Sequence, residues 1–231
     1  MNVYTYFEPY LSLRHRLTTW VTGGRRNWRS ENEQLLRLWE ASWRRKGWNP
    51  VVLDRKVAQE SIRYRNFLKA ISRLPSANDK AYEQACFLRH LAMSVVGGGV
   101  LSDYDCMNQS FTPEQAGAFL KDEVRFLEPY RVPCLIIGTK SGYEKVCDVF
   151  EEYRLTKEDR VRGRPHVSDM TILQKTKWPI VPVCVEYLHD GVNGNWENAP
   201  VVHFATEALR KKYKSGSKFF RIANVLREAC S

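Results

Sequence analysis

Two aspartates, Asp103 and Asp105, stand one residue apart at the end of an apolar segment. Residues 95–108 read VVGGGVLSDYDCMN: an apolar run enters three glycines, and a second apolar stretch leaves them and ends at the carboxylates. Residues i and i+2 of an extended segment project to the same side, so both carboxylates can face one site. Two like charges held close together are costly unless a cation or hydrogen-bond donors offset them. Oxygen ligands of this kind suit Mg²⁺ or Mn²⁺, which often join carboxylates to a diphosphate.

The bare Asp-x-Asp pattern has an ordinary alternative, which is a surface loop with two solvated carboxylates. The position of the pair favours a site instead. The segment 99–102 (GVLS) has the composition of a short strand, and the first aspartate follows it directly. In an open α/β sheet, ligands bind beyond the carboxyl ends of the strands.

The charge of the chain narrows the kind of partner. The 231 residues carry a formal net charge of +10, which favours a polyanionic partner such as a nucleic acid, a membrane surface or a phosphorylated small molecule. No apolar run approaches the roughly 18 residues that span a membrane. The first twenty residues are too polar for a signal peptide. We therefore expect no transmembrane segment and a cytoplasmic location.

The cysteines are scattered along the chain. There are six of them and they form no Cys-x-x-Cys pair. In the absence of an export signal, we interpret them as reduced packing residues rather than as disulfides or a zinc site. They are Cys86, Cys106, Cys134, Cys147, Cys184 and Cys230.

Strands and helices alternate along the sequence. Apolar alternation and short apolar runs predict strands at 2–7, 49–54, 99–102, 132–138, 180–188 and 200–205. Helical spacing and capping residues predict helices that begin at Ser30, near residue 57, at Asn78, at Thr112, at Ser141 and near Asp169, followed by a basic helical tail. Residues 8–30 and 160–164 read as basic loops. This alternation predicts an α/β class with a mostly parallel central sheet in a single domain.

The segment around the aspartates resembles a known family. CFLRHLAMSVVGGGVLSDYD (86–105) is similar to the DXD segment of GT-A-fold glycosyltransferases, most closely the sugar-binding DXD group and its family-34 relatives. In those enzymes an arginine-bearing helix runs into a glycine pair, a strand and then Asp-x-Asp. The residues that match this order and spacing are Arg89, Gly98, Gly99, Asp103 and Asp105.

The match has two departures. The family usually has an aspartate three residues before the arginine, where this chain has Cys86, and a tyrosine two residues before the first aspartate, where it has Leu101. These positions concern contacts to the sugar rather than to the metal. Fainter similarities extend over most of the chain, but the specific ones lie within residues 81–106.

The resemblance implies a fold and an activity. The fold would be a single GT-A-like domain, with a nucleotide-sugar-binding half at 1–106 and an acceptor-side half at 107–231. The activity would be metal-dependent transfer of a sugar from a nucleotide-sugar donor, with UDP as the expected nucleotide, to a hydroxyl of a glycan or another acceptor.

The resemblance also implies the metal ligands. Asp105 would bind the metal directly, and Asp103 would hold the ribose or donor sugar and reach the metal less directly. His203, in a segment that resembles the family's C-terminal motif, would be the third protein ligand. A histidine with carboxylates suits Mn²⁺, with Mg²⁺ as the other candidate.

Further roles follow from the same resemblance. Arg89 would reach the donor sugar or its diphosphate, and Tyr6 and Phe7 would line the pocket for the base. Lys211, in the basic stretch RKKYKSGSK, would bind the donor. Asp169, within HVSDMTIL, would act in catalysis or acceptor binding.

Each of these residues also has a structural alternative. His203 lies among apolar residues, where a hydrogen-bonded core histidine is common. Arg89 borders the apolar face of its helix and could form an internal ion pair. Tyr6 and Phe7 could be core aromatics, and Asp169 could serve the start of its helix, where the helix dipole favours an acid.

Two other functions compete with the transferase. A nucleotidyltransferase also uses carboxylates and Mg²⁺ on an α/β sheet, but it should have a glycine-rich phosphate loop after the first strand, where this chain has EPYLSL. A basic nucleic-acid-binding module would fit the net charge. The sequence shows no RRM, KH or helix-turn-helix pattern and its basic residues are dispersed, so we do not expect a nucleic-acid partner.

Overall fold

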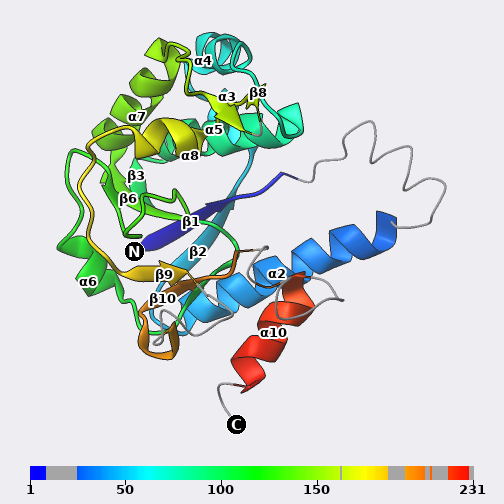
Figure 1. Ribbon diagram of the computed structural model, residues 1–231. Helices are drawn as coiled ribbons and strands as arrows, with labels where there is room; N and C mark the ends of the chain where they lie inside the picture. Colours follow the sequence, from blue (N-terminus) through cyan, green and yellow to red (C-terminus); the bar gives the residue numbers. More distant parts are fainter. Residues whose placement is uncertain (9–24, 162, 187–195, 206–208, 210–217, 229–231) are drawn as a thin grey trace.

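A five-stranded sheet in the order β2-β1-β3-β6-β5 forms the centre of the computed structural model (Figure 1). Its strands are β1 (Asn2–Tyr6), β2 (Asn49–Leu53), β3 (Gly98–Ser102), β5 (Arg125–Phe126) and β6 (Leu135–Thr139). The structure describes residues 1–8, 25–161, 163–186, 196–205, 209 and 218–228.

The α/β class predicted from the sequence is confirmed, but the sheet is mixed rather than mostly parallel. β1 runs parallel to β2 and to β3, whereas β6 runs antiparallel to both β3 and β5. Ser102, which ends β3, is paired with Leu135, which begins β6. The intervening segment thus returns to the end of the sheet that it left, without the crossover that a parallel pairing requires.

Alternating side chains divide the core between the two faces of the sheet. On one face, Tyr4, Leu101 and Ile136 belong to a cluster that the helices α4 (Tyr64–Ile71), α5 (Lys80–Val95) and α7 (Lys140–Glu152) complete. Figure 1 shows these helices together on one side of the sheet, with α3 (Arg55–Gln59) and α8 (Asp169–Gln174) beside them.

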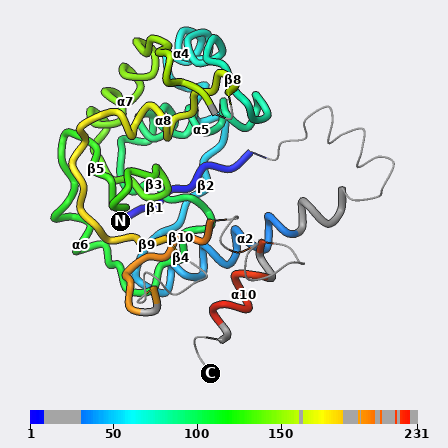
Figure 2. The backbone as a smooth tube through the Cα atoms, in the orientation of Figure 1, coloured from blue at the N-terminus to red at the C-terminus, as the bar shows by residue number. Residues whose placement is uncertain are grey.

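The opposite face is covered by one long helix and a second, smaller sheet. The helix is α2 (Arg25–Arg44), and the small sheet has the order β4-β10-β9. Its strands are β4 (Cys106–Asn108), β10 (Val201–His203) and β9 (Cys184–Glu186). Figure 2 shows these three strands close to α2, and α10 (Lys218–Glu228) packs against the same helix. The core on this face holds three buried tryptophans, Trp39, Trp43 and Trp48.

Three glycines lie at the start of β3, Gly97 just before the strand and Gly98 and Gly99 within it, and they adopt a backbone conformation that other residues rarely adopt. Gly97, Gly98 and Gly99 have φ values of 92°, 87° and 124°. A Cβ on Gly98 would lie 2.5 Å from the carbonyl oxygen of Gly138 on β6. The glycine therefore allows α5 to turn into β3 while β3 lies close against β6.

Several predicted helix starts shift in the structure. α2 begins at Arg25, so Ser30 lies inside the helix, because nothing in 25–29 breaks a helix. α5 takes Asp79 rather than Asn78 as its N-cap. α7 begins at Lys140, after an N-cap Thr139 that makes no side-chain capping bond. The helix start predicted at Thr112 is confirmed by a capping box on α6 (Pro113–Gly117).

Other predicted elements differ from the structure in extent or in type. The predicted helix near 57–73 divides into α3 and α4. Within the predicted basic loop 160–164, Arg160 and Val161 form β7 (Arg160–Val161) and Arg164 begins β8 (Arg164–Pro165), which pairs antiparallel with β7. Of the predicted loop 8–30, residues 9–24 lie outside the described residues.

Within the described residues, no helix has both the length and the apolar character that crossing a membrane requires.

Candidate metal site and cleft

A tight turn at the end of β3 places the two aspartates. The backbone N–H of Asp103 donates to the carbonyl of Cys134 at 2.7 Å, and the N–H of Cys106 donates to the carbonyl of Asp103 at 3.0 Å. Two indoles support the turn from α2: Trp39 Nε1 donates to Ser102 Oγ at 3.2 Å, and Trp43 Nε1 donates to the carbonyl of Cys106 at 3.0 Å. The buried tryptophans thus hold the ends of the strands that flank the carboxylates.

Strand pairing brings His203 to this turn from far along the chain. β10 is antiparallel to β4, and the register pairs His203 with Cys106. The N–H of Phe204 also donates to the carbonyl of Asp105 at 3.0 Å. The histidine therefore stands next to the second aspartate because two short strands pair.

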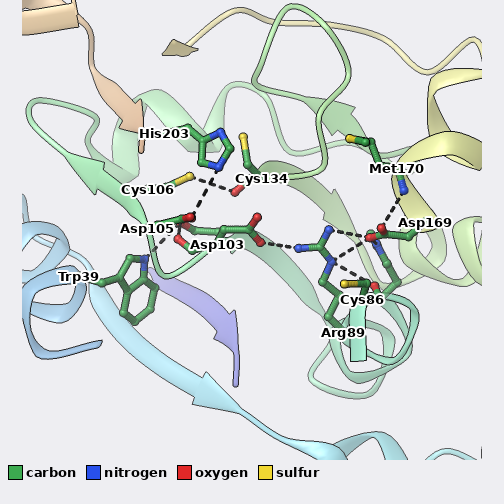
Figure 3. A network of polar contacts seen from close by, with 12 residues as sticks. Trp39, Cys86, Arg89, Asp103, Asp105, Cys106, Cys134, Asp169, Met170 and His203 are labelled. Atoms are coloured by element: carbon green, nitrogen blue, oxygen red, sulfur yellow. Dashed lines mark hydrogen bonds and ion pairs between the residues drawn. The ribbon is translucent and has the colours of Figure 1, made fainter. Parts of the chain in front are cut away.

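The structure brings together the three ligands that the resemblance implies. One possible ligand atom from each of Asp103, Asp105 and His203 lies within 4.8 Å of the others. His203 Nε2 is 3.7 Å from Asp105 Oδ1, and the two side chains are 11% and 12% exposed. Figure 3 shows the three side chains converging. Two carboxylates and an imidazole can hold a divalent cation, but this geometry does not select Mn²⁺ over Mg²⁺.

Lys218, the first residue of α10, is a cation at this site that the sequence did not single out. Its ammonium forms an ion pair with Asp105 Oδ2. Burial opposes the charged form of Asp105, but Lys218 and His203 outweigh it and hold the pKa of this carboxyl below its ordinary value. The predicted donor ligand Lys211 lies outside the described residues. Lys218 ends the same basic stretch, RKKYKSGSK, so the stretch itself was the available signal.

Asp103 has a different environment. Its carboxylate accepts a hydrogen bond from the guanidinium of Arg89 on α5. Loss of hydration deep in the site raises the pKa of Asp103 to about 6, and the nearby charge of Asp105 adds to this effect while Arg89 opposes it. The two aspartates therefore differ in proton affinity although they are neighbours in the sequence.

Arg89 joins Asp103 to Asp169, the first residue of α8. Arg89 Nε and Nη2 lie 3.1 Å and 2.6 Å from Asp169 Oδ2. The same oxygen is 3.3 Å from His90 Nε2, and Asp169 Oδ1 accepts the N–H of Met170 at 2.7 Å. Although burial opposes the charged form, Arg89 and His90 keep the pKa of Asp169 below its ordinary value. A carboxylate engaged in this way is a weak proton acceptor, but it fixes the position of Arg89.

The aspartates and Arg89 line a cleft of about 670 Å³, within the ordinary range for a small-molecule site. Tyr6, which ends β1, and Phe7, which follows it, also line the cleft; their predicted contact with a base stays a prediction. Phe7 packs edge-on against Tyr104, with ring centroids 5.7 Å apart. Glu83 and His166, two residues that the sequence did not single out, also line the cleft.

Comparison of the chain with known protein families, with curated proteins and with solved structures gave no match. The geometry of the cleft and the resemblance of residues 86–105 therefore carry the functional argument.

Proposed function

We propose that this protein is a metal-dependent glycosyltransferase, which transfers a sugar from a nucleotide-sugar donor, with UDP as the expected nucleotide, to a hydroxyl of a glycan or another acceptor. The observation that carries the proposal is the pair of carboxylates, Asp103 and Asp105, at the wall of the cleft, with His203 beside them. The net charge of +10 supports an anionic substrate.

The metal would be Mn²⁺ or Mg²⁺. Asp103 and Asp105 supply the oxygen ligands, and His203 Nε2 faces them as a third candidate. The chemistry that the ion supplies when bound is Lewis-acid stabilisation of the departing diphosphate.

The residues around the ion suit the rest of a nucleotide sugar. The Lys218 ammonium lies against Asp105, where it can also contact diphosphate oxygens. The rings of Tyr6, Phe7 and Tyr104 line one part of the cleft and offer apolar surface to a base. We assign this part of the cleft to the donor.

The acceptor would bind elsewhere in the cleft. The cleft is also lined by Asn78, Glu83 and His166, which offer hydrogen-bonding groups to acceptor hydroxyls. Arg89 would present its charge to the donor sugar or diphosphate while Asp169 holds it in place. Asp169 thus acts in the proposal as a positioning residue rather than as the proton acceptor.

The test is turnover of a panel of sugar nucleotides in the presence of Mn²⁺, with release of the nucleoside diphosphate as the readout. We expect slow hydrolysis of one donor without an acceptor and faster release with the correct acceptor. Asp105→Asn should abolish release, whereas Asp54→Asn should not, because Asp54 is not among the residues that line the cleft and asparagine caps α3 equally well. Release that persists in Asp105→Asn would refute the proposal.

A further inference from the structure

A second set of ligand atoms lies immediately behind the carboxylates. The thiols of Cys106 and Cys134 and one ring nitrogen of His203 lie within 4.8 Å of one another. Cys106 begins β4, Cys134 directly precedes β6, and His203 ends β10. Both thiols are fully buried, and Figure 3 shows them beside the imidazole.

A third thiol belongs to the same corner of the core. Cys184 begins β9, where it pairs with Val201 of β10, and it is fully buried. Its thiol is outside the group of ligand atoms that lie within 4.8 Å of one another, but it stands on the strand next to His203. Cys106 and Cys184, which are far apart in the sequence, thus both belong to strands of the small sheet.

The imidazole is not a satisfied core histidine. His203 Nε2 faces Asp105 Oδ1, whereas Nδ1 is buried and has no hydrogen-bond partner among the described residues. Asp105 Oδ1 is likewise buried and lacks a hydrogen-bond partner in this part of the chain. A buried polar atom without a partner destabilises the fold, so two such atoms on neighbouring side chains require an explanation.

We propose that Cys106, Cys134 and His203 Nδ1 bind a zinc ion, and that Cys184 moves in from β9 as the fourth ligand. Three thiolates and an imidazole are a common tetrahedral ligand set for a structural zinc ion. Bonds of about 2.3 Å to sulfur and 2.0 Å to nitrogen place the ligand atoms of such a site roughly 3.5–3.8 Å apart. The three atoms within 4.8 Å of one another reach that geometry through small side-chain movements.

The zinc ion satisfies both unpartnered atoms at once. With Nδ1 bound to the metal, the proton of the neutral ring lies on Nε2 and is donated to Asp105 Oδ1. A zinc-bound histidine that donates its other N–H to a carboxylate is a recurrent arrangement, and it fixes the ring and the carboxylate together. His203 then orients Asp105 instead of binding the second cation, which Asp103, Asp105 and substrate oxygens hold.

The test is elemental analysis of the purified full-length chain, followed by replacement of the zinc with Co²⁺. We expect a single zinc ion per chain and a Co²⁺ form with the strong thiolate-to-cobalt charge-transfer absorption of a tetrahedral site. Cys134→Ser should reduce this absorption, because one thiolate ligand is gone, and weaken binding by at least about 10-fold. Cys147→Ser is the matched control, because Cys147 is a buried thiol of the other core cluster and should keep the absorption.

The wild-type spectrum decides the question even where the serine variant fails to fold. Absence of zinc together with a Co²⁺ form that lacks thiolate absorption would show that the cysteines are packing residues. An absorption unchanged in folded Cys134→Ser would also overturn the assignment. Asp105→Asn separates this site from the proposed transferase function, because the thiolate absorption should remain whether or not nucleotide binding is lost.

Discussion

The guanidinium of Arg89 joins two carboxylates that lie 14 and 80 residues further along the chain. It contacts Asp103 at the end of β3 and Asp169 at the start of α8, and its side chain is 10% exposed. One side chain thus connects a helix on one face of the sheet, the end of a central strand and the first turn of a short helix. This connection fixes the positions of Arg89, Asp103 and Asp169, which all line the cleft.

Removal of Arg89 should destabilise the fold strongly. In Arg89→Met, the two carboxylates lose the cation between them, and breaking a buried ion pair in this way typically costs about 3–5 kcal/mol. Arg63→Met is the matched control, since Arg63 also contacts two carboxylates, those of Asp148 and Glu151, but on the surface. Its loss should be within about 1 kcal/mol. Urea unfolding of both variants measures the difference, and equal small losses would contradict the role of Arg89.

Replacement of Asp105 should remove metal-dependent binding without unfolding the chain. In Asp105→Asn the shape is retained, while an anionic ligand atom is lost and the Lys218 ammonium loses its partner. We expect the affinity for Mn²⁺ with a nucleoside diphosphate to fall by at least about 100-fold. Calorimetric titration of this variant and of the Asp54→Asn control measures the effect. Wild-type affinity in Asp105→Asn would mean that the aspartate pair is a solvated turn that binds no metal.

Replacement of glycine by alanine at the start of β3 should destabilise the fold far more at Gly98 than at Gly97. Gly98→Ala places a methyl group 2.5 Å from a backbone oxygen of β6, so strands must separate. Gly97→Ala has open space around its Cβ and meets the strain of a positive φ, about 1–2 kcal/mol. Thermal unfolding should therefore show a much larger loss for Gly98→Ala. The reverse order would mean that β3 and β6 are less closely apposed.

The aspartate pair and its place after a strand could be predicted because both features are local in the sequence. The neighbourhood of His203 could not be derived from spacing, since it depends on the pairing of β4 with β10; the resemblance alone pointed to it. The direction of β6 was missed because the path of the segment between β3 and β6 leaves no periodic signal. The position of two thiols beside His203 was missed for a similar reason: Cys106 and Cys134 meet this histidine only through tertiary packing.

Asp159 should make stability depend on pH far from the cleft. Burial opposes its charged form, but the ammonium of Lys175 and the N–H of Thr156 outweigh it and hold the pKa of Asp159 at about 2. A depressed pKa in the folded state stabilises the fold above the unfolded-state pKa, near 4. This contribution is lost as the pH falls from about 4 towards 2.

Asp159→Asn should therefore be less stable than the wild type at pH 7, by about 1–3 kcal/mol. The gap should narrow as the pH falls through 4. Asp148→Asn is the control, because Asp148 is half exposed and pairs at the surface. Unfolding curves across this pH range measure both variants, and a gap that widens in acid would show that Asp159 is not held in its charged form.

The central claim is that a divalent cation joins the carboxylates of Asp103 and Asp105 to a nucleoside diphosphate. The most direct measurement is thermal unfolding of the wild-type chain with UDP, in Mn²⁺ and in EDTA. At a UDP concentration of 100 times the dissociation constant, binding should add about 2.7 kcal/mol to stability in Mn²⁺ and nothing in EDTA. Equal stabilisation in both solutions, or none in either, would contradict the claim.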